Sequence, residues 1–261
     1  MTDPGRRSRR LRLRRIPVRA LLPNIITLLA IVSGITAIRL GVEGRFQLAI
    51  GAIVLAMVLD GIDGRLARLL KSATRFGAEL DSLADFVNFG VAPAVLIYLW
   101  SLAALKNLGW LAALALAIAC VLRLARFNVA LDESDAPVWR KRFFMGIPAP
   151  AGAMLALTPI FLGFLGLVEG RASAPVVLVW VVLVAAGMIS KLPTYSGKTA
   201  SRIDRDMFLP LLASLVFGAA LLVTYPWHVM LALSVAYVIS LPFSWRSWRR
   251  HARQQHAQTR A

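Results

Sequence analysis

Four aspartates are the residues of this sequence best suited to chemistry, and they all lie in one stretch, DGIDGRLARLLKSATRFGAELDSLAD. The chain has only 13 acidic residues in 261, so this is a marked concentration, formed by Asp60, Asp63, Asp81 and Asp85. On helices, spacings of three and four place paired carboxylates on one face, about 5–6 Å apart. A turn between Gly64 and Gly77 would bring the two faces together.

Four clustered carboxylates repel one another and are costly to remove from water unless cations accompany them. The stretch holds no histidine or cysteine, and an all-oxygen ligand set suits Mg²⁺ or Mn²⁺. We therefore expect the four aspartates to bind divalent ions. Two ions would bring the site close to neutral and leave room for substrate phosphates. A solvated acidic helix end is the alternative, and it is disfavoured because the surrounding segment ends are basic.

The elements that must position these aspartates are apolar. The chain is 58% hydrophobic with a mean hydropathy of +0.68, well above soluble domains. Windows of about 18–20 apolar residues can each cross a hydrocarbon core about 30 Å thick. We expect an all-α polytopic membrane bundle of about eight transmembrane helices, at residues 21–40, 46–63, 83–105, 109–127, 149–168, 174–191, 207–225 and 227–243. Prolines in the third and fifth spans predict kinks or shifted starts, at Pro93, Pro148 and Pro150.

Basic residues predict the orientation of these spans. Threading eight spans places 26 of the 30 lysines and arginines on one side, in segments 1–20, 64–82, 123–148, 190–206 and 244–261. By the positive-inside rule both termini, and the aspartate stretch, are cytoplasmic. The expected organisation is a basic arm (1–20), a transmembrane catalytic domain (21–243) and a basic tail (244–261). The net charge of +17 therefore suits anionic membrane lipids, and we expect no nucleic-acid partner.

The residues between the aspartates suggest a site for a phosphorylated ligand. Small side chains at Gly64 and Ala67 would let a ligand approach the backbone, and Arg68 offers a fork of donors suited to phosphate. Gly77 would permit close helix contact. Asn24 and Thr27 could reach a nucleotide, although helix packing explains them nearly as well. The single cysteine, Cys120, excludes an intrachain disulfide and is predicted to be a small buried side chain.

The complete pattern, DG-x2-AR-x8-G-x3-D-x3-D, runs from Asp63 to Asp85 and resembles the signature of the CDP-alcohol phosphatidyltransferase family. Members of this family are membrane enzymes, commonly homodimers, that displace CMP from a CDP-linked alcohol with a second alcohol. The resemblance implies that Asp60, Asp63 and Asp81 are metal ligands, and that Asp85 is both ligand and general base. It implies that the nucleotide and phosphates are bound by Gly64, Ala67, Arg68, Gly77, Asn24 and Thr27.

Other stretches bear on the acceptor alcohol. RLARFN (123–128), FFMGIPAPAGA (143–153) and SKLPTYSGK (190–198), with LLPNIITL and FGAELDSLADFVNFGVAPA, resemble the membrane-bound phosphatidylserine synthases of bacteria and archaea. This resemblance implies CDP-diacylglycerol and L-serine as substrates, in a bacterial inner membrane with the site facing the cytoplasm. A serine carboxylate would suit cations and hydrogen-bonding groups. The candidates are Arg123, Arg126, Asn128, Lys191, Ser196 and Lys198.

Alternatives stay open from the residues alone. Arg123, Arg126 and Lys191 could simply extend toward the interface, as basic residues at span ends often do. The acceptor could be inositol, glycerol phosphate or choline. A membrane prenyltransferase also uses aspartates and magnesium, but with two separated motifs. A cation transporter is disfavoured because the charged residues gather at one face rather than at the membrane centre.

Overall fold

The computed structural model of the protein describes residues 18–70, 72, 74–131, 143–195 and 205–258. Its helices are α1 (Val18–Val42), α2 (Phe46–Leu69), α3 (Arg75–Asp85), α4 (Ala92–Trp100), α5 (Lys106–Leu131), α6 (Ala149–Phe164), α7 (Ala174–Ile189), α8 (Arg205–Thr224) and α9 (Pro226–Gln258). A π-helix (Phe86–Val91) joins α3 to α4, and a 3₁₀ turn (Leu102–Leu105) joins α4 to α5. The predicted all-helical fold is confirmed, with one small addition. Strands β1 (Phe143–Met145) and β2 (Pro193–Tyr195) pair antiparallel.

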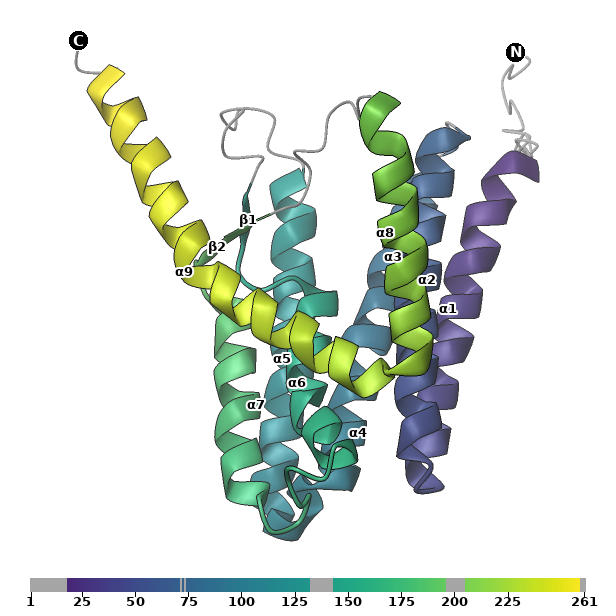
Figure 1. Ribbon diagram of the computed structural model, residues 1–261, viewed down its shortest axis with the longest axis vertical. Coiled ribbons are helices and arrows are strands. Elements are labelled where there is room, and N and C mark those ends of the chain that lie inside the picture. Colours follow the sequence, from purple (N-terminus) through teal and green to yellow (C-terminus); the bar gives the residue numbers. More distant parts are fainter. Residues whose placement is uncertain (1–17, 71, 73, 132–142, 196–204, 259–261) are drawn as a thin grey trace, which may run out of the picture.

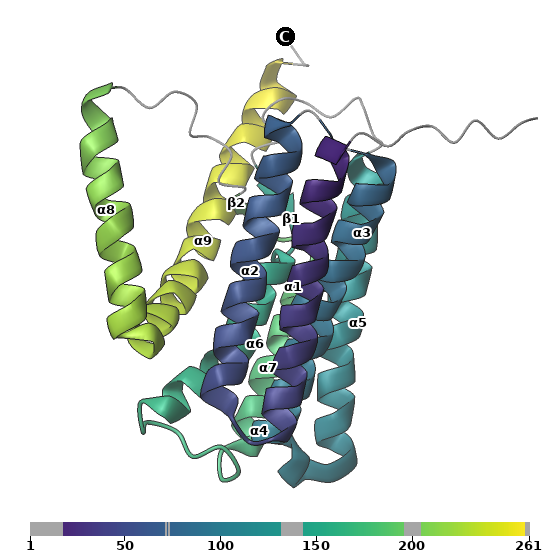
Figure 2. The same ribbon diagram turned by 90° about the vertical axis from the view of Figure 1, so that its right-hand side faces the viewer.

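Helices α1 to α7 form an upright bundle, and α9 crosses it obliquely (Figure 1). Helix α8 packs on α9 and stands apart from α1 and α2, as the second view shows (Figure 2). The ends of α2 and α5 and the starts of α1, α3 and α8 all lie at the same end of the bundle. The α1–α2 and α6–α7 links lie at the opposite end.

Five helical segments are long and apolar enough to cross a membrane, at Leu21–Val42, Phe46–Leu69, Arg75–Trp100, Leu102–Val129 and Pro226–Arg249. Three shorter apolar helices accompany them, at Ala149–Phe164, Ala174–Ile189 and Leu212–Thr224. Each predicted span coincides with one of these helices. Length and composition support five crossings, so the count of eight stays a prediction. Many large apolar side chains on the outside of the bundle are exposed, as expected of a surface that meets lipid.

Two predicted span boundaries differ most from the helices. The third span was expected to start at 83, but its helix starts at Arg75, because the hydroxyl of Thr74 accepts a 3.0 Å hydrogen bond from the Gly77 N–H and caps the first turn. Hydropathy locates the apolar part of a helix and misses such a polar beginning. The last span was expected to end at 243, whereas α9 continues to Gln258 through residues with no glycine or proline to stop it.

The predicted effects of proline are present in both places. Pro93 lacks an N–H, and in a regular α-helix its ring would collide with the carbonyl of Phe89. The wider π-helical turn before it relieves this conflict. Pro148 is the residue that precedes α6. Just before it, Gly146 has φ +83°, and a Cβ there would lie 2.4 Å from the carbonyl oxygen of Met188, so only glycine fits this turn.

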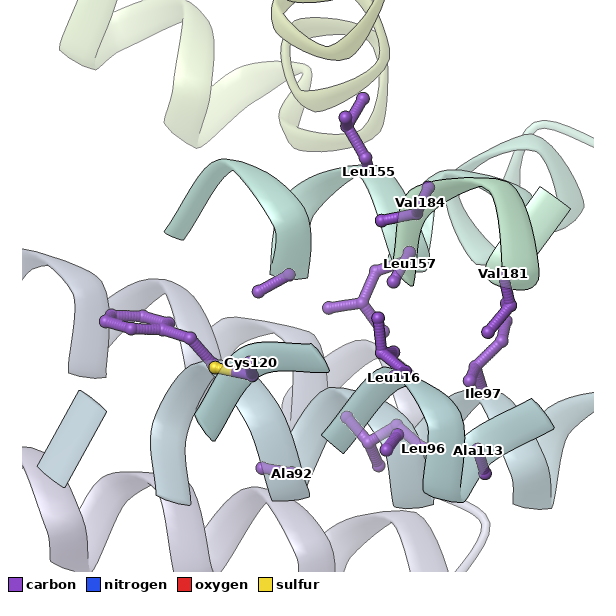
Figure 3. Packing of buried hydrophobic residues seen from close by; sticks show 14 of the residues in the cluster. Ala92, Leu96, Ile97, Ala113, Leu116, Cys120, Leu155, Leu157, Val181 and Val184 are labelled. Atoms are coloured by element: carbon purple, nitrogen blue, oxygen red, sulfur yellow. The ribbon is translucent and has the colours of Figure 1, made fainter. Parts of the chain in front are cut away.

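The buried core lies between α4, α5, α6 and α7 (Figure 3). Leu96 and Ile97 of α4 meet Leu116 of α5, and Leu157 and Val181 close the cluster from α6 and α7. Small residues such as Ala92 and Ala113 let the helices approach closely, which is how helices associate in lipid. Cys120 is buried in the same core, as predicted.

Candidate active site

The turn between α2 and α3 brings the four aspartates together. Asp60 and Asp63 lie near the end of α2, and Asp81 lies in α3. One carboxylate oxygen from each of these three residues lies within 4.8 Å of the other two. Asp85, one turn beyond Asp81, places its carboxylate against that of Asp60. The spacing argument therefore described the geometry correctly: both pairs share one site.

The charge of this cluster is offset only in part by the described residues, through the more distant Arg68 and Arg123. No described lysine or arginine lies within ion-pair distance of the four carboxylates. Oδ1 of Asp63 and Oδ1 of Asp85 are buried without a hydrogen-bond partner among the described residues. Buried, unpaired carboxylate oxygens are unstable unless a cation or a proton meets them. This all-oxygen donor set fits hard divalent ions such as Mg²⁺ or Mn²⁺.

Helix α1 supports the cluster from behind. The Thr27 hydroxyl donates a 2.6 Å hydrogen bond to Oδ2 of Asp63, and both side chains are buried. Three residues earlier, Asn24 lies against α3. A Cβ built on Gly77 would come within 3.1 Å of Oδ1 of Asn24, so the glycine allows this close approach. Asn24 and Thr27 therefore both contact neighbouring helices, and Thr27 also contacts a carboxylate of the cluster.

The opposite side of the cluster is open. A Cβ built on Gly64 would meet nothing nearer than Nη1 of Arg68, at 3.7 Å. Ala67 is partly exposed, and Arg68 is exposed and acts electrostatically on Asp81. A phosphate placed over the aspartates could therefore reach both the backbone at Gly64 and the guanidinium of Arg68.

The candidate acceptor residues divide into distinct environments. Arg123 of α5 is buried, with 8% of its surface exposed, and its charge interacts with that of Asp85. Arg126 instead donates to the carbonyl oxygens of Ile189 at 2.6 Å and Ser190 at 3.3 Å, which satisfies the C-terminal end of α7.

Asn128 and Lys191 are the other described candidates. The Asn128 amide donates a 3.0 Å hydrogen bond to the hydroxyl of Ser82 on α3. Lys191 is exposed just after α7. Ser196 and Lys198 lie outside the described residues. The structure therefore brings Arg123 to the aspartates and holds Arg126 and Asn128 in contacts between elements.

With this geometry in view, we compared the chain with known proteins. A family model described as CDP-alcohol phosphatidyltransferase matches residues 20–190, and a second, CDP-alcohol phosphatidyltransferase 2, matches residues 206–242. The chain belongs to the CDP-alcohol phosphatidyltransferase family. The first match covers α1 to α7, and the second covers α8 and part of α9.

Several curated proteins similar to this chain share one name. The CDP-diacylglycerol–serine O-phosphatidyltransferase of Mycobacterium leprae is 36% identical over 251 residues, covering 92% of this chain and 83% of that protein. The protein of that name from Mycobacterium tuberculosis (strain H37Rv) is 38% identical over 232 residues, covering 88% and 79%. An archaeal one from Methanocaldococcus jannaschii is 34% identical over 175 residues, covering 67% and 75%.

Four polar residues near this family site were missed by the sequence reasoning. Ser82, beside Asp81, holds Asn128, and its position within the motif could have drawn notice. Asn88 is fully buried in the π-helix with neither amide atom hydrogen-bonded to a described residue, and a polar residue in an apolar run is a usable signal. Thr194 and Tyr237 belong to β2 and α9. Thr194 lies within the quoted stretch SKLPTYSGK, although it was not singled out there, whereas nothing in the sequence surroundings of Tyr237 marks it, because only folding brings it near Arg123.

Proposed function

We propose that this protein transfers the phosphatidyl group of CDP-diacylglycerol to the hydroxyl of L-serine, giving phosphatidylserine and CMP. The observation that carries the proposal is the group of four carboxylates from α2 and α3, with no described countercharge in ion-pair contact and an open glycine beside it. The name shared by relatives that cover most of this chain supports serine as the acceptor.

The aspartates would hold two divalent ions, Mg²⁺ or Mn²⁺. The position of Asp60 supports two ions rather than one. Asp60 lies close to Asp63 and Asp81 and also faces Asp85, so it could bridge two ions. Bound divalent ions would neutralise the carboxylates and the pyrophosphate charge of the substrate. Gly64, Ala67, Arg68 and Gly77 would then accommodate the phosphates and nucleotide, with Asn24 and Thr27 positioning the helices around them.

Asp85 would act as the general base. Its Oδ1 is buried and lacks a hydrogen-bond partner in the described chain, so it is free to accept a proton. As that proton leaves the serine hydroxyl, the serine oxygen attacks the phosphorus that bears diacylglycerol, and the bond from that phosphorus to CMP breaks. Positioned proton transfer of this kind contributes about 10²–10⁴-fold. We propose direct displacement, which a phosphatidyl-enzyme trapped without serine would contradict.

The acceptor would be bound beside Asp85. Arg123 is the best placed of the candidates to meet its carboxylate, since its charge acts at Asp85. Lys191, Ser196 and Lys198 would contribute from the segment that follows α7. Arg126 and Asn128 would support these residues through their contacts with the end of α7 and with Ser82.

The setting we propose is a bacterial inner membrane, with eight crossings, a cytoplasmic site and both termini in the cytoplasm. The supporting observation is that described arginines at the end of α2 (Arg68), the start of α3 (Arg75) and the end of α5 (Arg126) lie at the bundle end that holds the aspartates. These arginines, with the other basic residues of the chain, would contact anionic lipid headgroups. We also propose a homodimer, on the family resemblance.

The deciding experiment measures CMP release by the purified protein in detergent, with CDP-diacylglycerol and Mg²⁺ or Mn²⁺. L-Serine, inositol and glycerol 3-phosphate are offered separately. We expect release with serine alone, and none in EDTA. Release with another alcohol only would discard the serine assignment and keep the family chemistry, whereas no release with any acceptor would reopen the prenyltransferase and transport interpretations.

Matched variants test the site in the same assay. Asp81→Asn and Asp85→Asn are each expected to lower CMP release by about 10²-fold or more, because each removes a charge that the metals or the proton require. Glu79→Gln is the control: Glu79 is an exposed acid on the same helix, outside the cluster. Equal losses in all three variants would contradict a specific role for the aspartates.

A further inference from the structure

A second group of unpaired polar atoms lies next to the aspartates, contributed by α5 and α9. Arg123 is more than nine-tenths buried, and its Nε is shielded without a hydrogen-bond partner in the described part of the chain. The Tyr237 hydroxyl is also shielded and without a partner among the described residues. It lies beside Arg123 and Thr194. The Thr194 hydroxyl donates a 3.0 Å bond to the carbonyl oxygen of Gly146, so toward Tyr237 it can act only as an acceptor.

The charge of Arg123 is poorly matched by the residues around it. Its guanidinium lies 5.8 Å from the centre of the Phe127 ring, and the described carboxylate that acts on it is Asp85. In the proposed function Asp85 also serves the metals and the attacking hydroxyl. A buried cation that shares its one described countercharge in this way favours the binding of another anion. An ionisable residue inside a membrane segment usually marks a substrate site.

We propose that Tyr237 and Arg123 together bind the carboxylate of the amino-acid acceptor, so that α9 provides part of the acceptor site. The inference rests on the proposed function and names a specificity residue for it. A carboxylate accepts several hydrogen bonds, and a guanidinium and a phenol hydroxyl supply donors from two directions. With the carboxylate on Arg123, the hydroxyl of an acceptor as short as serine lies toward Asp85, where its proton must go.

Tyr237 therefore sets which alcohols react. Serine and ethanolamine have the same amino alcohol, but ethanolamine lacks the carboxylate. A site built around Arg123 and Tyr237 favours serine, because ethanolamine would leave the guanidinium and the hydroxyl unpaired. Inositol would leave them without an anion in the same way.

The test replaces Tyr237 by phenylalanine, which removes the hydroxyl and keeps the ring. In the CMP-release assay we expect Tyr237→Phe to raise the KM for L-serine about tenfold or more, in line with the loss of a hydrogen bond to a charged group. The KM for CDP-diacylglycerol should stay unchanged. The preference for serine over ethanolamine should fall by a similar factor. Tyr98→Phe is the control, because Tyr98 packs on Trp110, with ring centres 5.2 Å apart, in α4 and α5.

The wild-type protein gives a second test that needs no variant. L-Serine methyl ester keeps the hydroxyl and amine but has no carboxylate, so it should react poorly while L-serine reacts well. A Tyr237→Phe variant with the serine KM of the wild type would overturn the inference, as would equal rises in KM for both substrates. A wild type that uses inositol and ignores serine would instead refute the proposed function, so the two failures are distinguishable.

Discussion

Thr27 of α1 donates a 2.6 Å hydrogen bond to Oδ2 of Asp63, which leaves Oδ1 of that carboxylate as the unpaired atom. A buried hydroxyl on a neighbouring helix thus fixes which Asp63 oxygen is left for the proposed metal ion. Groups that orient a metal-binding side chain affect metal affinity about 10–100-fold. We expect Thr27→Val, which keeps the shape and removes the donor, to raise the Mg²⁺ or Mn²⁺ concentration for half-maximal CMP release about tenfold.

The matched control for this prediction is Thr27→Ser, which retains the hydroxyl. It should restore most of the metal response, whereas loss of packing alone would affect both variants. If Thr27→Val lowers the maximal rate with no change in metal dependence, the hydrogen bond does not position a metal ligand.

Gly34 and Asn88 show how tightly α1 packs on the π-helix. A Cβ on Gly34 would lie 2.1 Å from Oδ1 of Asn88, whose side chain is fully buried. Gly34→Ala should therefore lower the unfolding free energy in detergent by about 1–3 kcal/mol through overpacking. Gly51→Ala is the control, since a Cβ there would meet nothing within 4 Å. It should be neutral or slightly stabilising, because alanine favours helix by up to about 1 kcal/mol. Equal changes in unfolding free energy for the two variants would mean that the Asn88 side chain can move away from the new Cβ at no energetic cost.

Trp180 compensates for a proline in the neighbouring helix. Pro159 in α6 has no N–H to give to the carbonyl of Leu155, and the Trp180 indole donates to that oxygen at 2.7 Å. Trp180→Phe should lower the unfolding free energy by about 1 kcal/mol from the lost bond, with some further loss of packing. In a Pro159→Ala background, the alanine N–H can serve Leu155, so the same change should cost less. A double-mutant cycle with no coupling would contradict this account.

The features that the sequence predicts well are those set by residues close together along the chain. The aspartate cluster was predictable because its carboxylates lie on two helices joined by a short turn, so spacing and the turn together place Asp60 near Asp81. Cys120 and Pro148 were likewise predictable from local chemistry. The start of α3 was missed, since a polar first turn capped by Thr74 carries no hydropathy signal. Tyr237 was beyond reach, because only the crossing of α9 over the bundle brings it to Arg123.

The proposed orientation can be tested with single cysteines. Arg75 begins α3, at the end of the bundle with the aspartates, and Arg171 lies in the α6–α7 link at the other end, and both are exposed. Since Cys120 is buried in the core, a Cys120→Ala background leaves only the introduced thiol. By the positive-inside rule, we expect a membrane-impermeant maleimide to label Arg171→Cys in intact cells, and Arg75→Cys only after permeabilisation.

The reverse labelling pattern would place the aspartates outside the cytoplasm and refute the orientation. Labelling of both cysteines in intact cells would contradict a bundle whose two ends face different compartments. The expected pattern would make the aspartate site face the cytoplasm, where a water-soluble acceptor such as serine and the leaving nucleotide can exchange with solvent.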